Sequence, residues 1–271
     1  MSIRLVATDI DGTLLDDNLT VPASALAMIQ RLQQSGVIVT IATGRMHASA
    51  VQLAQELGID VPIVSYNGAM IKKGLSGQLL YHCPMTEEQV DMVWRLALSD
   101  DLAIHLYIDD VLYIRSLHPL SEDYIHTTRC PYQIVPDLRQ ITKRKGCPTK
   151  ILIAGQPEVL TNLWQQGIKQ FGEHLYITKS HVHFLEFLNP AVSKGKGVAK
   201  LGEILQIPYS QRLVIGDNLN DRELFSGGAV KIAMGNGVQE LKNLATWVAP
   251  PNHAGGWAKA MSRWVFQEAI S

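Results

Sequence analysis

Residues 5–15 of the chain read LVATDIDGTLL, in which an apolar run ends at two aspartates, Asp9 and Asp11, followed by Gly12. A short continuous apolar run of this kind is typical of a buried strand. Carboxylates gathered at the end of such a strand repel one another and lose hydration, so they need a neutralising partner. The stretch therefore predicts a buried strand whose carboxyl end carries a charged site, with a sharp turn at Gly12.

The composition excludes several classes of protein. The chain has 271 residues, 46% of them hydrophobic, which favours about two domains with a sizeable core. Its formal net charge of −1 provides no basic field, so we expect neither nucleic acid nor a membrane surface as a partner. Three cysteines without a CxxC pair favour a reducing, cytoplasmic setting. No run approaches the roughly 20 apolar residues of a membrane helix.

Strand-like and helical patterns alternate at both ends of the chain. Residues 24–34 and 47–58 have helical spacing, and residues 37–45 between them are strand-like. The next segment, VPIVSYNGAMI, contains an Asn-Gly pair, the strongest short-range signal for a tight hairpin turn. Near the other end, Ser193 can cap a helix, and the runs RLVIGD and AVKIAM are strand-like. This alternation predicts an α/β fold with a parallel sheet.

The middle of the chain has a mixed pattern. Residues 87–98 predict a helix, and short strands are predicted at AIHLYID, VLYIRS, KILIAG and HVHFLEF. We therefore expect an α+β domain over residues 83–188, inserted into a core made of residues 1–82 and 189–271. On a strand, His181 and His183 would share a face and could bind a transition metal, but no third ligand is spaced to join them. A surface or substrate-facing role fits this pair better.

The polar segments fall where strands of the core end, which is where ligands bind in open parallel sheets. Asp9 and Asp11 follow the first strand, Thr43-Gly44-Arg45 follows the second, and GDNLND (residues 216–221) follows a later one. Clustered carboxylates offer only oxygen ligands, which suit Mg²⁺. A carboxylate can also attack phosphorus and so divide one difficult displacement into two easier steps. The cluster therefore predicts magnesium-assisted phosphoryl chemistry.

This chemistry assigns a role to each residue of the cluster. Asp9 would attack phosphorus, and Asp11 would protonate the leaving group and then activate water. Thr43, Gly44 and Lys194 would bind the phosphoryl oxygens. Asp217 and Asp221, together with Asp9 and Asp11, would hold the metal. Thr43 could instead only cap the following helix, and Lys194 could be a solvated lysine in a first helical turn.

Four segments, DIDGTLLDD, TIATGR, VSKGKGVAKL and GDNLND, resemble in this order the four motifs of the haloacid dehalogenase superfamily. They are most similar to those of its Cof-type sugar-phosphate phosphatases. The resemblance covers residues 1–82 and 189–260 and is weaker across the insert. It implies a Rossmann-like core, with a large α/β cap inserted between the second and third motifs. Gly237, where the family has alanine, and HAGGW (residues 253–257) depart from the usual pattern without removing a catalytic group.

The resemblance also implies how the metal is held. It would bind a carboxylate oxygen of Asp9, the backbone carbonyl of Asp11 and a carboxylate oxygen of Asp217. Asn220 and Asp221 would support the phosphate, the lysine and metal-bound waters.

Together these observations predict a Mg²⁺-dependent phosphatase that hydrolyses a small phosphorylated metabolite, such as a sugar phosphate, through an aspartyl-phosphate. Two alternatives stay open, a phosphotransferase of the phosphomannomutase type and a non-enzymatic metabolite sensor on the same fold. Because the core motifs account for contacts to phosphorus and metal, we expect the insert to recognise the rest of the substrate. Glu186 and Asn189, which lead from the insert back to Lys194, are expected nearest the closed cleft. The sequence indicates no particular oligomeric state.

Overall fold

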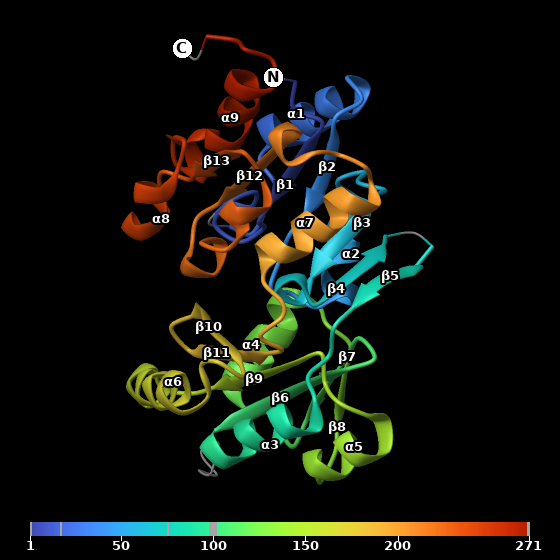
Figure 1. The fold of residues 1–271 in the computed structure, drawn as a ribbon, viewed down its shortest axis with the longest axis vertical. Coiled ribbons are helices and arrows are strands. Elements are labelled where there is room, and N and C mark those ends of the chain that lie inside the picture. Colours follow the sequence, from blue (N-terminus) through green and yellow to red (C-terminus); the bar gives the residue numbers. More distant parts are fainter. Residues whose placement is uncertain (1, 17, 75, 98–101, 270–271) are drawn as a thin grey trace.

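The computed structural model describes residues 2–16, 18–74, 76–97 and 102–269, which form two parts, one above the other in Figure 1. The upper part is built on a five-stranded sheet in the order β14-β13-β12-β1-β2. All its strands are parallel: β1 (Leu5–Thr8), β2 (Ile38–Ile41), β12 (Arg212–Gly216), β13 (Val230–Ala233) and β14 (Trp247–Val248). The predicted parallel α/β sheet is confirmed.

Helices cover both faces of this sheet, which explains why β1 is apolar throughout. Val6 packs into one core cluster with Ile29, while Leu5 and Ala7 pack on the other face with Val198. The first face carries α1 (Ala23–Gln34), α2 (His47–Glu56) and α9 (Gly256–Trp264), and the second carries α7 (Lys194–Ile204) and α8 (Gln239–Leu244). The Ser193 side chain accepts a hydrogen bond from the Lys196 amide at 3.3 Å and so caps α7, as predicted.

The lower part contains a second, six-stranded sheet in the order β10-β11-β9-β6-β7-β8. Its pairs are antiparallel except β7 with β8. The strands are β6 (Ala103–Ile108), β7 (Val111–Ile114), β8 (Tyr132–Ile134), β9 (Lys150–Ala154), β10 (Tyr176–His181) and β11 (Phe184–Leu188). The helices are α3 (Glu87–Leu96), α4 (Pro119–Thr128), α5 (Leu138–Lys145) and α6 (Pro157–Phe171). Residue 98, the expected end of the first helix, lies outside the described residues.

One predicted strand of the insert is wrong. HVHFLEF is not continuous, because β10 ends at His181 and β11 begins at Phe184. Val182 and His183 form the turn of this hairpin, and Val182 is 58% exposed. The alternating His-Val-His pattern is typical of a half-buried strand, but here it spans the end of β10 and an exposed hairpin turn. The two histidines therefore do not share a strand face, although their rings lie 5.6 Å apart between centroids.

A small antiparallel sheet of β3 (Pro62–Ser65), β4 (Met70–Lys73) and β5 (Leu79–His82) adjoins the parallel sheet through an isolated bridge between Ala42 and Val64. The predicted Asn-Gly turn joins β3 to β4, with Asn67 at φ 51° and Gly68 at φ 90°. A β-carbon at Gly68 would lie 2.1 Å from the carbonyl oxygen of Ser193. Glycine is therefore needed here both for the turn and for the close approach of α7.

None of the helices in the described part of the chain has the length and apolar character that crossing a bilayer requires.

Helix α7, which begins at Lys194, is packed tightly against the turn at Gly68. We expect Gly197→Ala to destabilise the protein by about 1–3 kcal/mol, because the added methyl would overpack this contact. It would lie 2.5 Å from Cγ1 of Val64 and 2.7 Å from Cα of Gly68. Thermal unfolding measures the change. Lys200→Ala, on the exposed face of the same helix, is the control and should change stability by less than about 0.5 kcal/mol. A melting temperature for Gly197→Ala at or above the parent value would contradict the packing argument.

Candidate active site

The polar segments of the core meet at one edge of the parallel sheet. Thr8 at the end of β1 pairs with Ile41 of β2 on one side and with Ile215 of β12 on the other. The next residues along the chain, Asp9, Ala42 and Gly216, therefore reach the same level of the sheet. This register brings together side chains that are more than 200 positions apart in the chain.

Lys194 lies at the centre of this edge. Its side chain is fully buried, and its Nζ donates hydrogen bonds of 2.6 Å to Oδ1 of Asp9 and 2.6 Å to Oδ1 of Asp221. Burial alone would lower the pKa of Lys194, but the charges of Asp221 and Asp9 outweigh it and raise the pKa above its ordinary value. The lysine is therefore a permanently charged bridge, and the alternative of a solvated lysine is wrong.

Asp9 combines burial with one free oxygen. Its amide donates to the carbonyl of Ile215 at 3.0 Å, which holds the backbone as an extension of β1. Oδ1 is bound by Lys194, whereas no described residue donates a hydrogen bond to Oδ2. Burial and then the charge of Asp221 raise the pKa of Asp9 well above its usual range, against the opposing effect of Lys194. Asp9 thus presents an under-neutralised carboxylate oxygen to the cleft.

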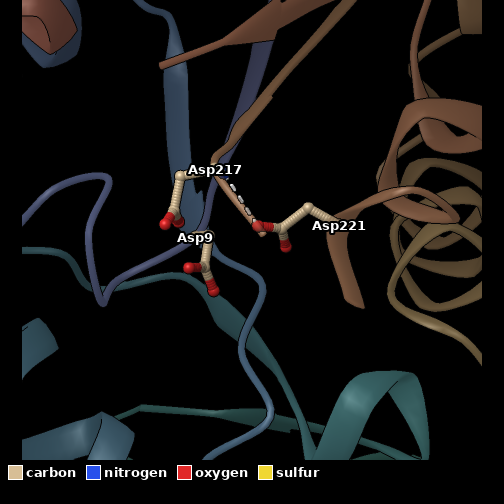
Figure 2. A group of neighbouring side chains, drawn as sticks. All are labelled: Asp9, Asp217 and Asp221. Atoms are coloured by element: carbon tan, nitrogen blue, oxygen red, sulfur yellow. Dashed lines mark hydrogen bonds between the residues drawn. The ribbon is translucent and has the colours of Figure 1, made fainter. Parts of the chain in front are cut away.

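Asp217 and Asp221 stand on the segment after β12. Oδ1 of Asp217 accepts a hydrogen bond of 2.9 Å from the Thr13 hydroxyl, and burial together with the charge of Asp221 raises the pKa of Asp217 to about 7. Oδ2 of Asp221 accepts from the backbone amides of Asp217 at 2.9 Å, drawn dashed in Figure 2, and of Asn218 at 3.1 Å. Because Lys194 takes the other oxygen, Asp221 acts as a buttress for the lysine and the loop.

The three carboxylates form the kind of site that a divalent cation occupies. Figure 2 shows Asp9, Asp217 and Asp221 converging, and ligand oxygens of all three lie within 4.8 Å of one another. Within the described ranges this is the one such group of three or more metal-ligating side chains. Burial first, and then the charge of the neighbouring Asp221, raise the pKa values of Asp9 and Asp217. All-oxygen ligands and surplus negative charge fit Mg²⁺, which when bound would neutralise charge on a phosphoryl group.

Asp11 has a different environment from Asp9. It is half exposed, and both its oxygens accept from the guanidinium of Arg45, with 2.9 Å between Nε and Oδ2. Gly12, at φ 75°, then turns the chain so closely past Asp217 that a β-carbon would lie 2.4 Å from Oδ2 of that residue. The structure thus separates the two aspartates of the DIDG segment: Asp9 faces Lys194, and Asp11 faces Arg45.

Thr43, Gly44 and Asn220 line the same cleft as Asp9. The buried Thr43 hydroxyl oxygen accepts from the Arg45 amide at 3.1 Å, which leaves its own proton available to a ligand. It does not cap α2, whose N-cap position is Met46, so that alternative is also wrong. Oδ1 of Asn220 is buried and has no hydrogen-bond partner among the described residues. The Thr43 hydroxyl and the Gly44 amide can donate to phosphoryl oxygens, whereas Oδ1 of Asn220 can only accept a hydrogen bond, for example from a metal-bound water.

A cleft of about 550 Å³ joins this edge to the insert. The core contributes Asp9, Asp11, Leu19, Thr43, Gly44, Arg45, Asn218 and Asn220, and the insert contributes one face of α4 and the hairpin between β10 and β11. The lining residues of the insert are Leu120, Asp123, Tyr124, Thr127, Thr128, Ser180, His181, His183, Phe184 and Glu186. Glu186 therefore lies where it was expected. Asn189 does not: its Nδ2 donates to the Pro84 carbonyl at 3.0 Å and ties together the two linkers between core and insert.

Sequence reasoning missed three residues that support the site. Thr13 fixes Asp217, and Arg45 binds Asp11. Both stand within the quoted segments, so a closer reading of DIDGT and TGR could have found them. Lys150 gave no such signal, because in KILIAG it resembles an exposed lysine at the start of a strand. Its Nζ is instead buried and donates to the Gly44 carbonyl at 2.7 Å and to Glu186 at 2.8 Å.

Carboxylates and a buried lysine at the ends of parallel strands, facing an inserted domain, define a hydrolase-type α/β enzyme. Residues 6–261 match the family of haloacid dehalogenase-like hydrolases. The chain is 28% identical to the 5-amino-6-(5-phospho-D-ribitylamino)uracil phosphatase YitU of Bacillus subtilis, covering 96% of this chain and 97% of that protein. It is 26% identical to the HMP-PP phosphatase of Escherichia coli O6:H1, covering 88% and 86%.

Among solved structures, the subclass IIB sugar phosphatase BT4131 superposes with a TM-score of 0.83 at 18% identity, covering 96% of this chain and 98% of that one. The resemblance found in the sequence is confirmed. The chain belongs to the haloacid dehalogenase-like hydrolases and is a phosphatase of the Cof type.

Protons should compete with a cation for the carboxylate site. Burial and the charge of Asp221 raise the pKa of Asp217 to about 7, so Asp217 is increasingly protonated as the pH falls from 8 to 6. We therefore expect the apparent Kd for Mg²⁺ to increase over this range by about tenfold for each proton displaced. Titration calorimetry in buffers of different ionisation enthalpy measures both the Kd for Mg²⁺ and the number of protons displaced. Asp217→Asn should bind Mg²⁺ more weakly, and a Kd independent of pH would contradict the assignment.

Proposed function

We propose that the protein is a Mg²⁺-dependent phosphatase that hydrolyses a small phosphorylated metabolite through an aspartyl-phosphate on Asp9. The observation that carries the proposal is the state of Asp9: one oxygen is held by Lys194 and the other is free in the cleft. A carboxylate fixed in this way can attack phosphorus in line with the leaving group. Mg²⁺ would be held by Asp9 and Asp217, with the Asp11 carbonyl as a further ligand from the family resemblance.

The residues around Asp9 divide the remaining work. Oδ2 of Asp9 forms a bond to phosphorus while the bond from phosphorus to the ester oxygen breaks, and Asp11 gives its proton to that oxygen. Asp11 then takes a proton from water, which attacks the phosphoryl-enzyme and restores the Asp9 carboxylate. Thr43 and Gly44 donate to the phosphoryl oxygens. Since Arg45 binds Asp11 as a carboxylate before substrate arrives, Asp11 has to leave this ion pair and take up a proton from solvent before it can protonate the leaving group.

The size and lining of the cleft support a small substrate. About 550 Å³ accommodates a phosphate and a leaving group of metabolite size, and the relatives named above act on small phosphorylated compounds. A sugar phosphate is one plausible class. We propose residues 83–188 as a cap that closes on the core formed by residues 1–82 and 189–271, and a cytoplasmic location in keeping with the unpaired cysteines. The inner wall of the cap, including His181 and His183, would contact the leaving group.

Phosphate release tests the function directly. With a panel of phosphorylated metabolites and Mg²⁺, we expect free phosphate from at least one sugar or heterocyclic ester, loss of activity in chelator and recovery on adding Mg²⁺. Asp9→Asn should reduce turnover by several orders of magnitude, because an amide cannot form the acyl-phosphate. Transfer of phosphate to a second hydroxyl without release would indicate a mutase instead, and metabolite binding without any turnover would indicate a sensor.

The acid role of Asp11 is tested by the leaving group. Asp11→Asn should slow the hydrolysis of an alkyl phosphate by roughly 10²- to 10⁴-fold, because the alkoxide then leaves without a proton. An aryl phosphate has a better leaving group and should lose much less in the first step. Single-turnover kinetics on both esters separates this step from hydrolysis of the intermediate. Equal losses on the two esters would rule out proton donation by Asp11.

A further inference from the structure

We propose that Lys150 and Glu186 are positioning residues through which the insert sets the geometry of the phosphate-binding loop, Thr43-Gly44-Arg45. The inference rests on the proposed function, since it concerns how the same site is completed. Both side chains come from the middle of the insert's sheet, Lys150 from β9 and Glu186 from β11. Both are almost completely buried, and their contacts reach across to the core.

The contacts of Lys150 lead step by step to the phosphate-binding hydroxyl. Its Nζ donates 2.7 Å to the carbonyl oxygen of Gly44, which belongs to the peptide between Gly44 and Arg45. The N–H of that same peptide donates to the Thr43 hydroxyl oxygen at 3.1 Å. Because the peptide is planar, fixing its carbonyl also fixes its N–H. Lys150 thereby orients the Thr43 hydroxyl and the backbone of Arg45, the residue whose side chain binds Asp11.

Glu186 holds the other end of the loop. Its Oε2 accepts a hydrogen bond of 2.6 Å from Nδ2 of Asn67, and the backbone amide of Asn67 donates 2.9 Å to the carbonyl of Thr43. The Gly44 carbonyl is therefore held by Lys150 itself, and the Thr43 carbonyl is held by Asn67, which Glu186 binds. A buried charged pair of this kind is poor at adding stability but effective at fixing geometry, because each unpaired charge would be costly.

Glu186 lines the cleft, yet most of its acceptor sites are already occupied. Oε1 accepts from Lys150 at 2.8 Å and from the Ser180 hydroxyl at 3.0 Å, and Oε2 accepts from Asn67. The side chain is 2% exposed and so has little capacity left to recognise a leaving group. The sequence placed Glu186 nearest the closed cleft, in the domain expected to recognise the substrate, whereas its contacts favour a positioning role. A positioning role affects every phosphate ester by the same factor, whereas a specificity role affects each one differently.

The consequence is that the phosphate site of the core is complete only with the insert in place. Without Lys150 the Gly44 carbonyl loses its charged donor, and without Glu186 the Asn67 amide loses its acceptor. Neither residue belongs to the cluster of Asp9, Asp217 and Asp221 at which magnesium would bind. Phosphate binding and metal binding should therefore respond differently when the pair is removed.

The experiment compares the parent with Lys150→Met/Glu186→Gln, which removes both charges together and leaves no unpaired buried ion. We expect kcat/KM to fall by a common factor, on the order of 10- to 100-fold, on an alkyl phosphate, a sugar phosphate and an aryl phosphate. The Kd of inorganic phosphate, measured by calorimetry with Mg²⁺ present, should rise by a similar factor, while the Kd of Mg²⁺ alone stays at the parent value. His183→Ala, on the cleft wall, is the control: it should affect the substrates unequally and leave the phosphate Kd unchanged.

Two outcomes would overturn the proposal. One is a folded double variant with the parent's phosphate Kd, and the other is a loss confined to some substrates. If circular dichroism shows that the double variant does not fold, Glu186→Gln alone carries the test. Its amide oxygen can keep the hydrogen bond from Lys150, but its NH2 group then replaces the acceptor that Asn67 uses, so a common loss on all three substrates is again expected, and no change would count against the pair. Phosphate binding reports on the loop even if the parent hydrolyses no ester, so failure of the proposed function is recognised separately.

Discussion

The buried ammonium of Lys194 is the interaction on which the site depends. It binds Asp9 from the end of β1 and Asp221 from the segment after β12, at 2.6 Å each, and it stands at the start of α7. Two carboxylates this close would otherwise repel each other at a place where burial removes most of their hydration. The close packing of α7 on the Gly68 turn, where even a methyl group at Gly197 would not fit, keeps the ammonium at this position.

Much of the core could be predicted from the sequence because its determinants are local. Buried strands, the Ser193 cap and the turn at Gly68 each follow from a few adjacent residues, and the parallel register then brings Asp9, Thr43 and Asp217 to one edge. The insert was less predictable for a physical reason. The alternating pattern at the hairpin turn near His183 occurs in turns as well as in strands, so it predicted one continuous strand where the chain turns.

Lys150 shows why the supporting residues were harder to find. A lysine at the first position of a strand is usually solvated, and nothing adjacent to it indicates burial. Its partners lie 106 and 36 positions away in the chain, at Gly44 and Glu186. Glu186 stands on the neighbouring strand of the same sheet, whereas Gly44 belongs to the core and meets Lys150 only where the insert lies against the core. Asn189 presents the opposite case: its place before α7 suggested the cleft, but its amide is used to join the two linkers.

Charge and geometry are supplied by different parts of the molecule. At the end of β1, four carboxylates (Asp9, Asp11, Asp217 and Asp221) face two cations, Lys194 and Arg45, among the described residues, an excess of two negative charges when all are ionised. A phosphate dianion entering this cleft would be repelled unless a divalent cation offset that excess. The ion pair of Lys150 and Glu186 adds no net charge, so its effect on the site can only be geometric. The core thus sets the electrostatic requirement for a metal, and the insert sets the orientation of the groups that receive the phosphate.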